Sequence, residues 1–258
     1  MRIKTSGKRA LGGLGMAAIA VIYTVPRAGS DSSPVSDAVA RMLPVSVTRP
    51  LDTVDAAAGW DLANIDNPRV DSWVRRFQES APMRRTLSIW LNRMTKYETM
   101  ISKKLDEREM PQDLIFLAMI ESGFNPRAKS PAAAGGLWQF ISETGRRYGL
   151  KISRKIDERN QPAKATDAAL SYLSDLHDRF GSWYLAAAAY NVGQGRIAKT
   201  MKQVTGKTKG TDADFYRIAS RLPKETRDYV PKLVAVARIA KSPAKFGVDA
   251  PVLVANLD

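Results

Sequence analysis

The stretch from Tyr184 to Asn191 constrains the fold of this chain more than any other sequence feature. It is almost wholly apolar and contains four consecutive alanines. Alanine is the strongest helix former, and a helix that is apolar on every side must be buried. Small side chains also let neighbouring helices approach closely. We therefore expect this helix to lie in the interior, with other helices packed against it, and to run into a turn at Gly193-Gln-Gly195.

Apolar residues at helical spacing recur along the rest of the chain. A long amphipathic helix is predicted to end at the charged cluster before Pro111, and its apolar positions are Leu87, Trp90, Met94, Tyr97, Ile101 and Leu105. A second pattern runs from Thr166, the expected N-cap, to Phe180, and Gly181 is expected to end that helix.

The remaining segments complete a helical pattern. Residues 199–214 look polar and loose, and a final helix is expected from Pro223 to Ala240, interrupted or bent at Pro231. Alternating strand patterns are not evident. The fold class is therefore predicted to be mainly α.

The chain has 258 residues, of which 44% are hydrophobic, enough for one sizeable core with appendages. We predict four parts: a signal peptide or N-terminal anchor at residues 1–28, a flexible tether at 29–68 with a short helix at Val35–Met42, a catalytic domain at 69–245, and a tail at 246–258. Cysteine is absent, so neither a disulfide nor lipid attachment through cysteine is available to this sequence.

The N-terminus resembles an export signal. A basic stretch is followed by the uncharged run Ala10 to Val25 and then by Pro26. The run is shorter than the roughly 20 apolar residues of a spanning helix, which favours a signal peptide. Cleavage after Ala28 is disfavoured by Pro26, so an uncleaved anchor is the alternative. We expect an exported protein of the periplasm or cell envelope.

Glu121 is the strongest candidate for a catalytic residue. It shares one helical face with Leu114, Leu117 and Ala118, which places a carboxyl group where an apolar side chain is expected. Desolvation disfavours the charged form and raises a carboxyl pKa. The helix must stop by Asn125-Pro126, so the negative end of the helix dipole adds to the same effect. The alternative is a salt-bridged structural glutamate.

Ordered motifs follow Glu121. They are Glu121-Ser-Gly-Phe-Asn-Pro126, Ser130, Gly136-Leu-Trp-Gln-Phe140, Ala189-Tyr-Asn191 with Gly193, and Leu222-Pro-Lys-Glu-Thr-Arg-Asp-Tyr-Val-Pro-Lys232. Together they resemble the motifs of family 1 lytic transglycosylases, with a soluble lytic transglycosylase-like domain, and look most like the membrane-bound lytic murein transglycosylase D group. The resemblance spans about Arg69 to Ala240.

This resemblance implies a lysozyme-like (goose-type) helical domain with a deep cleft that cleaves the MurNAc-β-1,4-GlcNAc bond of peptidoglycan. Glu121 matches the family's single acid and base. It would first protonate the glycosidic oxygen and then take a proton from the muramyl C6 hydroxyl, giving 1,6-anhydro-MurNAc ends without consuming water. The resemblance also implies substrate-binding roles for Ser130, Gln139, Tyr190, Asn191, Glu225 and Tyr229.

Several of these residues can also be explained by a purely structural role. Ser130 suits a turn, Asn191 a helix cap, and Tyr190 a buried hydroxyl, whereas Trp138 is at least as well explained by core packing as by stacking on a sugar. The sequence departs from the family at Asn160, where relatives commonly carry an acid. It also has nothing after Ala240 that resembles peptidoglycan-binding repeats.

Two rival activities use the same fold. A hydrolytic muramidase would normally need a second carboxylate, and the candidates are weak: Asp157 and Glu158 suit an ion-paired turn and Glu143 a solvated helix. The other rival is a catalytically silent peptidoglycan-binding scaffold.

The expected partners are peptidoglycan glycan strands, with possible membrane association through the N-terminal segment. The net charge of +14 favours polyanionic surroundings but does not identify them. A nucleic-acid-binding motif is not recognisable, so we expect no nucleic-acid partner. Neither a metal nor another cofactor is implied, since the lone His177 suits packing or the surface. We expect a monomer.

Overall fold

The computed structural model describes residues 59–249, which form ten α-helices joined by loops and short 3-10 helices. The expected signal segment, the helix at Val35–Met42 and the last nine residues lie outside this range. The α-helices are α1 (Pro68–Glu79), α2 (Ala81–Met94), α3 (Glu98–Asp106), α4 (Ile115–Ser122), α5 (Ser142–Arg147), α6 (Pro162–Phe180), α7 (Trp183–Val192), α8 (Gln194–Thr205), α9 (Asp212–Ile218) and α10 (Lys224–Lys241).

The prediction of a mainly α fold is confirmed. Within residues 59–249 the extended pairing is limited to isolated bridges, which join Lys129 to Gly135, Gly135 to Phe140, and Ile152 to Asp157. Two of the three bridges lie in the loop between α4 and α5. That loop is therefore a fixed structure, although it has no helix of its own.

Helix α7 is buried as its alanines predict. Every residue from Tyr184 to Asn191 is buried, and α6, α8, α9 and α10 all pack against the helix. Ser182 caps its N-terminus by accepting a hydrogen bond from the backbone N–H of Leu185. The small side chains allow these helices to approach closely. Helix α7 is consequently the centre of the fold.

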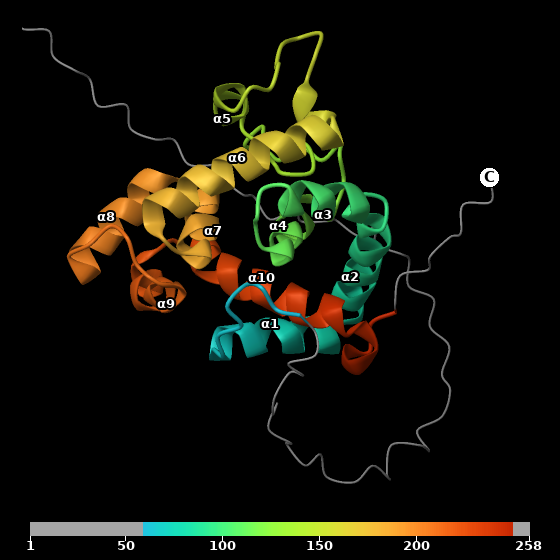
Figure 1. Ribbon diagram of the computed structural model, residues 1–258. Coiled ribbons are helices and arrows are strands. Elements are labelled where there is room, and N and C mark those ends of the chain that lie inside the picture. The colour runs from blue at the N-terminus through green and yellow to red at the C-terminus, as the bar shows by residue number, and fades with distance from the viewer. Residues whose placement is uncertain (1–58, 250–258) are drawn as a thin grey trace, which may run out of the picture.

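Helix α10 connects the two ends of the described chain. It lies beside α1 in Figure 1 and also packs on α4 and α7. Pro231 lies inside α10, which continues through it as one helix. The expected interruption is therefore wrong, the alternative of a bend at Pro231 stays a prediction, and the predicted extent of the helix is nearly correct. Because it contacts α4, α10 can bring C-terminal side chains to Glu121.

The single long helix predicted over Leu87 to Leu105 is wrong. The structure divides it into α2 and α3 at a turn, where the N–H groups of Lys96 and Tyr97 donate to Arg93 and Met94. Tyr97 stacks on Phe124, with ring centroids 6.4 Å apart and planes 12° from parallel. The apolar spacing continues through the turn because both helices bury one face, α2 against α1 and α3 against α4 and α6.

Two further boundaries differ from the predictions. Thr166 is not an N-cap, since α6 begins a turn earlier at Pro162 and the Thr166 hydroxyl donates to the Pro162 carbonyl. Residues 199–214 are not loose, because α8 extends to Thr205 and α9 begins at Asp212. A capping box of Thr211 and Asp214 starts α9.

The last residues of the expected tether contact the helical domain. Leu62 is buried in the hydrophobic core, and Arg238 of α10 bonds the side chains of Asn64 and Asp66. Asp61 and Asp113 each accept a backbone N–H from the other residue. We therefore propose that the domain begins at about Trp60, which is earlier than the expected boundary at residue 69.

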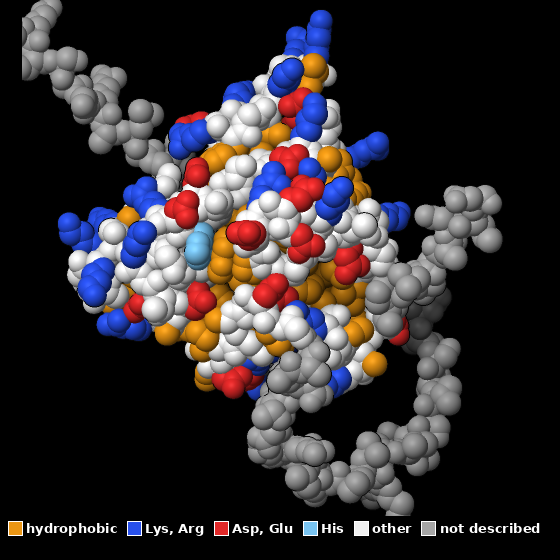
Figure 2. All heavy atoms as spheres, in the orientation of Figure 1, with side chains coloured by type: hydrophobic (Ala, Val, Ile, Leu, Met, Phe, Trp, Pro, Cys, Tyr) orange, Lys and Arg blue, Asp and Glu red, His pale blue; other side chains and the backbone are white. Residues whose placement is uncertain are grey.

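The described surface carries many cations. Figure 2 shows that, on the face in view, Lys and Arg side chains gather over α8 and over the loop that follows α5. Helix α8 itself contributes Arg196, Lys199 and Lys202. None of the helices within residues 59–249 combines the length and apolar character needed to cross a membrane.

Candidate active site

Glu121 lies in the last turn of α4 with only 6% of its surface exposed. The helix ends at Ser122 because Gly123 adopts a left-handed conformation, with φ of 57°. A Cβ on Gly123 would lie 2.1 Å from the Trp90 indole, so glycine also lets Trp90 pack directly against the end of α4. Leu117 and Ala118 are fully buried on the same face, as predicted.

Tyr229 is the direct partner of Glu121. Its hydroxyl donates to Glu121 Oε1 at 2.5 Å, which joins α10 to α4. Tyr190 of α7 is fully buried, and the charge of Glu121 raises the pKa of its hydroxyl. Burial itself raises the pKa values of both tyrosines well above that of a free phenol. Both therefore remain protonated and able to donate.

Burial raises the pKa of Glu121 to about 7. The hydrogen bond from Tyr229 and the positive charge of Lys232 oppose this rise, whereas the charge of Glu225 adds to it. A carboxyl group with a pKa near neutrality can donate a proton and, once ionised, accept one. This is the environment predicted from the apolar helix face.

Lys232 is a site residue that the sequence analysis did not single out. It lies one turn beyond Tyr229 in α10, and its ammonium lies 5.4 Å from the centre of the Trp90 ring and 5.8 Å from that of Trp73. Burial lowers the pKa of Lys232, whereas the charges of Glu121 and Glu225 raise it. The spacing of Glu225, Tyr229 and Lys232 by four and three residues could have revealed this shared face.

Asn191 and Glu225 lie beside each other at the edge of the site. Asn191 Oδ1 accepts a hydrogen bond from Thr226 at 2.7 Å, and its buried Nδ2 lies near Glu225 without completing a hydrogen bond to it. Partial burial raises the pKa of Glu225, and the Asn191 side chain opposes the rise. Glu225 is the other carboxylate of the site, and its charge raises the pKa of Glu121.

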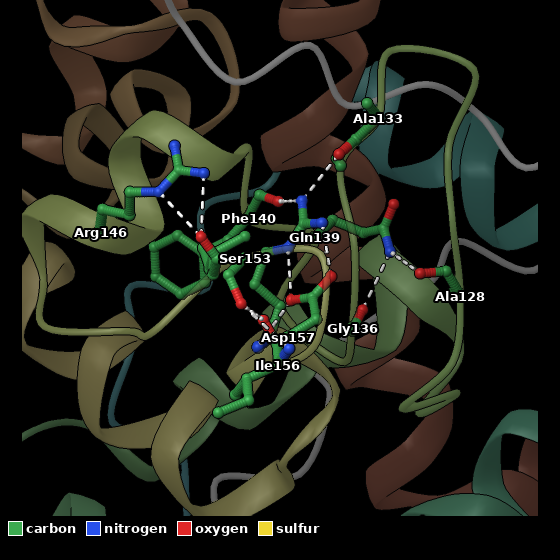
Figure 3. A network of polar contacts seen from close by, with 12 residues as sticks. Ala128, Ala133, Gly136, Gln139, Phe140, Arg146, Ser153, Ile156 and Asp157 are labelled. Atoms are coloured by element: carbon green, nitrogen blue, oxygen red, sulfur yellow. Dashed lines mark hydrogen bonds and ion pairs between the residues drawn. The ribbon is translucent and has the colours of Figure 1, made fainter.

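The loop from Ala128 to Phe140 holds the other two predicted binding residues. Ser130 Oγ accepts the backbone N–H of Ala134, and Gln139 donates from its amide nitrogen to the carbonyls of Ala128 and Gly136 (Figure 3). Both side chains are buried. They shape the loop from inside, so their predicted contacts with substrate remain proposals.

Two hydrogen bonds fasten this loop to α4 and α7. The hydroxyl of Ser122 donates to the Leu137 carbonyl at 2.8 Å, and that of Tyr190 donates to the Trp138 carbonyl at 2.7 Å. Trp138 is itself fully buried, with its indole N–H donating to Thr166. The packing reading of Trp138 is therefore confirmed, and its ring is not exposed for sugar stacking.

Arg159 supports the loop from the opposite side. Its guanidinium donates to the carbonyls of Ala133 and Phe140 and pairs with Asp157 at 2.7 Å. Gly136 has φ of 82°, and a Cβ there would lie 1.8 Å from the Arg159 carbonyl oxygen. The glycine is required both by its backbone conformation and by this close approach.

The weaker carboxylate candidates form structural ion pairs. Asp157 pairs with Arg159, Glu158 with Lys164 at 2.6 Å, and Glu143 with Arg147 at 3.4 Å. The interpretation of Asp157 and Glu158 as an ion-paired turn is thus confirmed. His177 stacks on Trp183 with ring centroids 4.0 Å apart, which confirms its packing role.

Comparison with known proteins gives the same result as the motifs. Residues 98–212 match the transglycosylase SLT domain. Membrane-bound lytic murein transglycosylase D of Escherichia coli strain K12 is 42% identical over 160 residues, 62% of this chain and 34% of that protein. Peptidoglycan transglycosylase gp16 of Escherichia phage T7 is 34% identical over 145 residues, 55% of this chain and 10% of that protein.

A solved structure is also similar. The 70-kDa soluble lytic transglycosylase of Escherichia coli aligns at 25% identity with a TM-score of 0.47, over 59% of this chain and 25% of that chain. The chain spans about a third of the length of the Escherichia coli transglycosylase D that it matches.

Fold and site together define a mainly helical domain in which the carboxyl group of Glu121 is buried against the hydroxyl of Tyr229. With the matches above, the chain contains a lytic transglycosylase family 1 domain, and the resemblance seen in its motifs is confirmed.

Proposed function

We propose that this protein is a peptidoglycan lytic transglycosylase with Glu121 as its single acid and base. The proposal rests on the family match and on one observation above all: Glu121 is buried, touches Tyr229, and has a pKa of about 7. In the first step, protonated Glu121 gives its proton to the glycosidic oxygen between MurNAc and GlcNAc, and that bond breaks. An oxocarbenium-like or acetamido-bridged intermediate results.

In the second step the Glu121 carboxylate takes the proton of the muramyl C6 hydroxyl. The C6 oxygen bonds to C1, which closes a 1,6-anhydro ring and restores protonated Glu121, so no water is consumed. The Tyr229 hydroxyl and the Lys232 ammonium both favour the carboxylate. They stabilise the Glu121 carboxylate while the intermediate exists, before the proton of the C6 hydroxyl reaches it. Ser130, Gln139, Tyr190, Asn191 and Glu225 are proposed to bind or enclose the glycan strand.

A hydrolytic muramidase is the second candidate, and Glu225 is the observation that favours it. Its charge acts on Glu121, and burial raises its pKa. A second carboxylate near the acid can activate a water when the separation of the two groups leaves room for it. If Glu225→Gln still releases anhydro products, Glu225 does not have this hydrolytic role. If the wild type releases reducing-end muramic acid and Glu225→Gln does not, the role is established.

Cellular placement and domain limits are further parts of the proposal. Residues 1–28 would direct export to the periplasm or cell envelope, either cleaved or retained as an anchor, and the chain would act on glycan strands as a monomer. The catalytic domain would extend from about residue 60 to residue 245, with a C-terminal tail beyond it.

Mass spectrometry of fragments from purified peptidoglycan tests the activity. Wild-type protein is expected to release 1,6-anhydro-MurNAc ends, and Glu121→Gln to reduce the rate by at least about 100-fold, the usual contribution of a general acid. Reducing-end muramic acid would support the muramidase. Binding of peptidoglycan without any release of fragments would support the silent scaffold.

A further inference from the structure

A basic cavity lies where α1 packs against the start of α10. Its volume is about 360 Å³, and its walls include Arg69, Trp73 and Arg76 from α1 with Lys224, Arg227 and Asp228 from α10. Four cations therefore surround one carboxylate. None of these residues has a role in the mechanism proposed above.

The carboxylate of Asp228 is already engaged by two of the cations. Arg69 contacts it at 3.4 Å and Lys224 at 2.7 Å. Arg76 and Arg227 form no ion pair with a carboxylate of residues 59–249, and Arg227 Nε is buried without a hydrogen bond in that range. The Arg76 guanidinium lies 4.9 Å from the centre of the Trp73 ring, which holds it at the cavity wall. The cavity thus has two guanidinium groups without an ion-paired carboxylate among residues 59–249, and a guanidinium fork matches a carboxylate in bidentate geometry.

The cavity also adjoins the candidate active site. Trp73 forms one of its walls, and the Lys232 ammonium lies 5.8 Å from the Trp73 ring and 5.4 Å from the Trp90 ring. The charge of Lys232 acts on both Glu121 and Glu225. Lys232 therefore links the basic cavity to the catalytic acid through one side chain.

We propose that the basic cavity binds a carboxylate of the peptide attached to the glycan strand, with Arg76 and Arg227 as its ligands and Trp73 packing against the peptide's apolar atoms. This inference rests on the proposed function. Peptidoglycan peptides bear free carboxylates, and the cavity volume falls within the range of small-ligand sites. The substrate itself delivers this anion beside Glu121, which favours it over a phosphate from a lipid headgroup.

Kinetics on two forms of one substrate test the site. Soluble glycan strands are prepared with their peptides intact and, in a second batch, with the peptides removed by an amidase. The double variant Arg76→Gln/Arg227→Gln is expected to raise KM about tenfold on intact strands, from the loss of charge-assisted hydrogen bonds, with kcat retained. On stripped strands its KM should equal that of wild type.

The control variant is Lys202→Gln/Lys207→Gln. It removes one exposed charge from α8 and one from the segment that follows it, and neither residue lines the cavity. It should leave the ratio of the two KM values unchanged. Equal losses for the double variant on both substrates would overturn the inference, as would no loss on either. A wild type that cleaves neither substrate would instead refute the proposed function.

A binding measurement separates the possible sources of the anion. Glu121→Gln is titrated with the free peptide, with inorganic phosphate, and with phosphatidylglycerol vesicles, while the Trp73 indole resonance is followed by NMR. A shift with the peptide that disappears in Glu121→Gln/Arg76→Gln/Arg227→Gln supports the site. A shift with phosphate or vesicles only would overturn it.

Discussion

At the scale of single residues, the site depends on a balance at Glu121. Burial alone would keep this carboxyl protonated, but the hydroxyl of Tyr229 and the charge of Lys232 lower its pKa to about 7. A carboxyl held fully protonated could not act as a base in the second step. We therefore propose that Lys232 is a positioning residue, which acts through its charge on Glu121.

The pH dependence of kcat should report this balance. Cleavage requires protonated Glu121, so kcat is expected to fall as the pH rises through about 7. Lys232→Met removes a charge that lowers the pKa of Glu121, and the descending limb should move to higher pH by on the order of one unit. Lys232→Arg should restore the wild-type profile. A uniform loss of kcat without a shift would mean that Lys232 is only structural.

At the scale of elements, the loop between α4 and α5 shapes the floor of the site. It is held by Ser122, Tyr190 and Arg159, all through its backbone carbonyls. The hydrogen bonds from Arg159 depend on Gly136, because the carbonyl oxygen of Arg159 lies where the Cβ of any other residue at position 136 would be. The element is therefore specified more by close contacts than by its own propensity.

Gly136→Ala should reveal this dependence. A Cβ would meet the Arg159 carbonyl oxygen at 1.8 Å, and we expect a loss of about 3 kcal/mol in the free energy of unfolding. Gly149→Ala is a matched control, since Gly149 has a similar φ of 87° but open space around it. It should cost only about 1 kcal/mol. Urea denaturation measures both, and equal costs would contradict the close-contact argument.

The sequence predicted which helices exist better than it predicted where each helix begins and ends. Period and glycine signals located α4, α7 and α10, because these helices are buried on a consistent face. The turn between α2 and α3 was missed, since the apolar spacing continues across Thr95 to Tyr97 while the backbone changes direction. The start of α6 was missed because Thr166 satisfies its hydroxyl within the helix.

The sequence predicted only part of the candidate site, because local patterns do not show long-range contacts. Glu121 and Tyr229 could be proposed because motifs identify them, and the structure joins them directly. Lys232 is a common surface residue type, and its proximity to Glu121 depends on how α10 crosses α4. Such a long-range contact leaves no mark in local periodicity.

At the scale of the whole molecule, the segment before α1 fastens both ends of the described chain together. Lys241, at the end of α10, pairs with Asp113 at 2.6 Å and lies 4.9 Å from the ring centre of Trp60. Asp113 is only 2% exposed and also accepts the backbone N–H groups of Asp61 and Leu62. This cluster gives the N-terminal residues a structural role that a tether would not have.

Lys241→Met should therefore destabilise the fold by about 3 kcal/mol, because it leaves a buried carboxylate without its cation. Burial raises the pKa of Asp113 above its unfolded value, so protonation favours the folded state and the loss should be smaller at pH 5 than at pH 8. Lys103→Met, at an exposed pair with Glu107, should change stability by less than about 0.5 kcal/mol. Thermal unfolding at both pH values checks the comparison.

The bond between Tyr229 and Glu121 also has a consequence for biosynthesis. The two residues are 108 positions apart, so the acid leaves the ribosome long before the helix that supplies its hydroxyl. Domains assemble as their chain becomes available. A nascent chain that stops before α10 has Glu121 but not the tyrosine and lysine that tune it. We therefore expect the tuned acid to form only after α10 has been synthesised and has packed on α4.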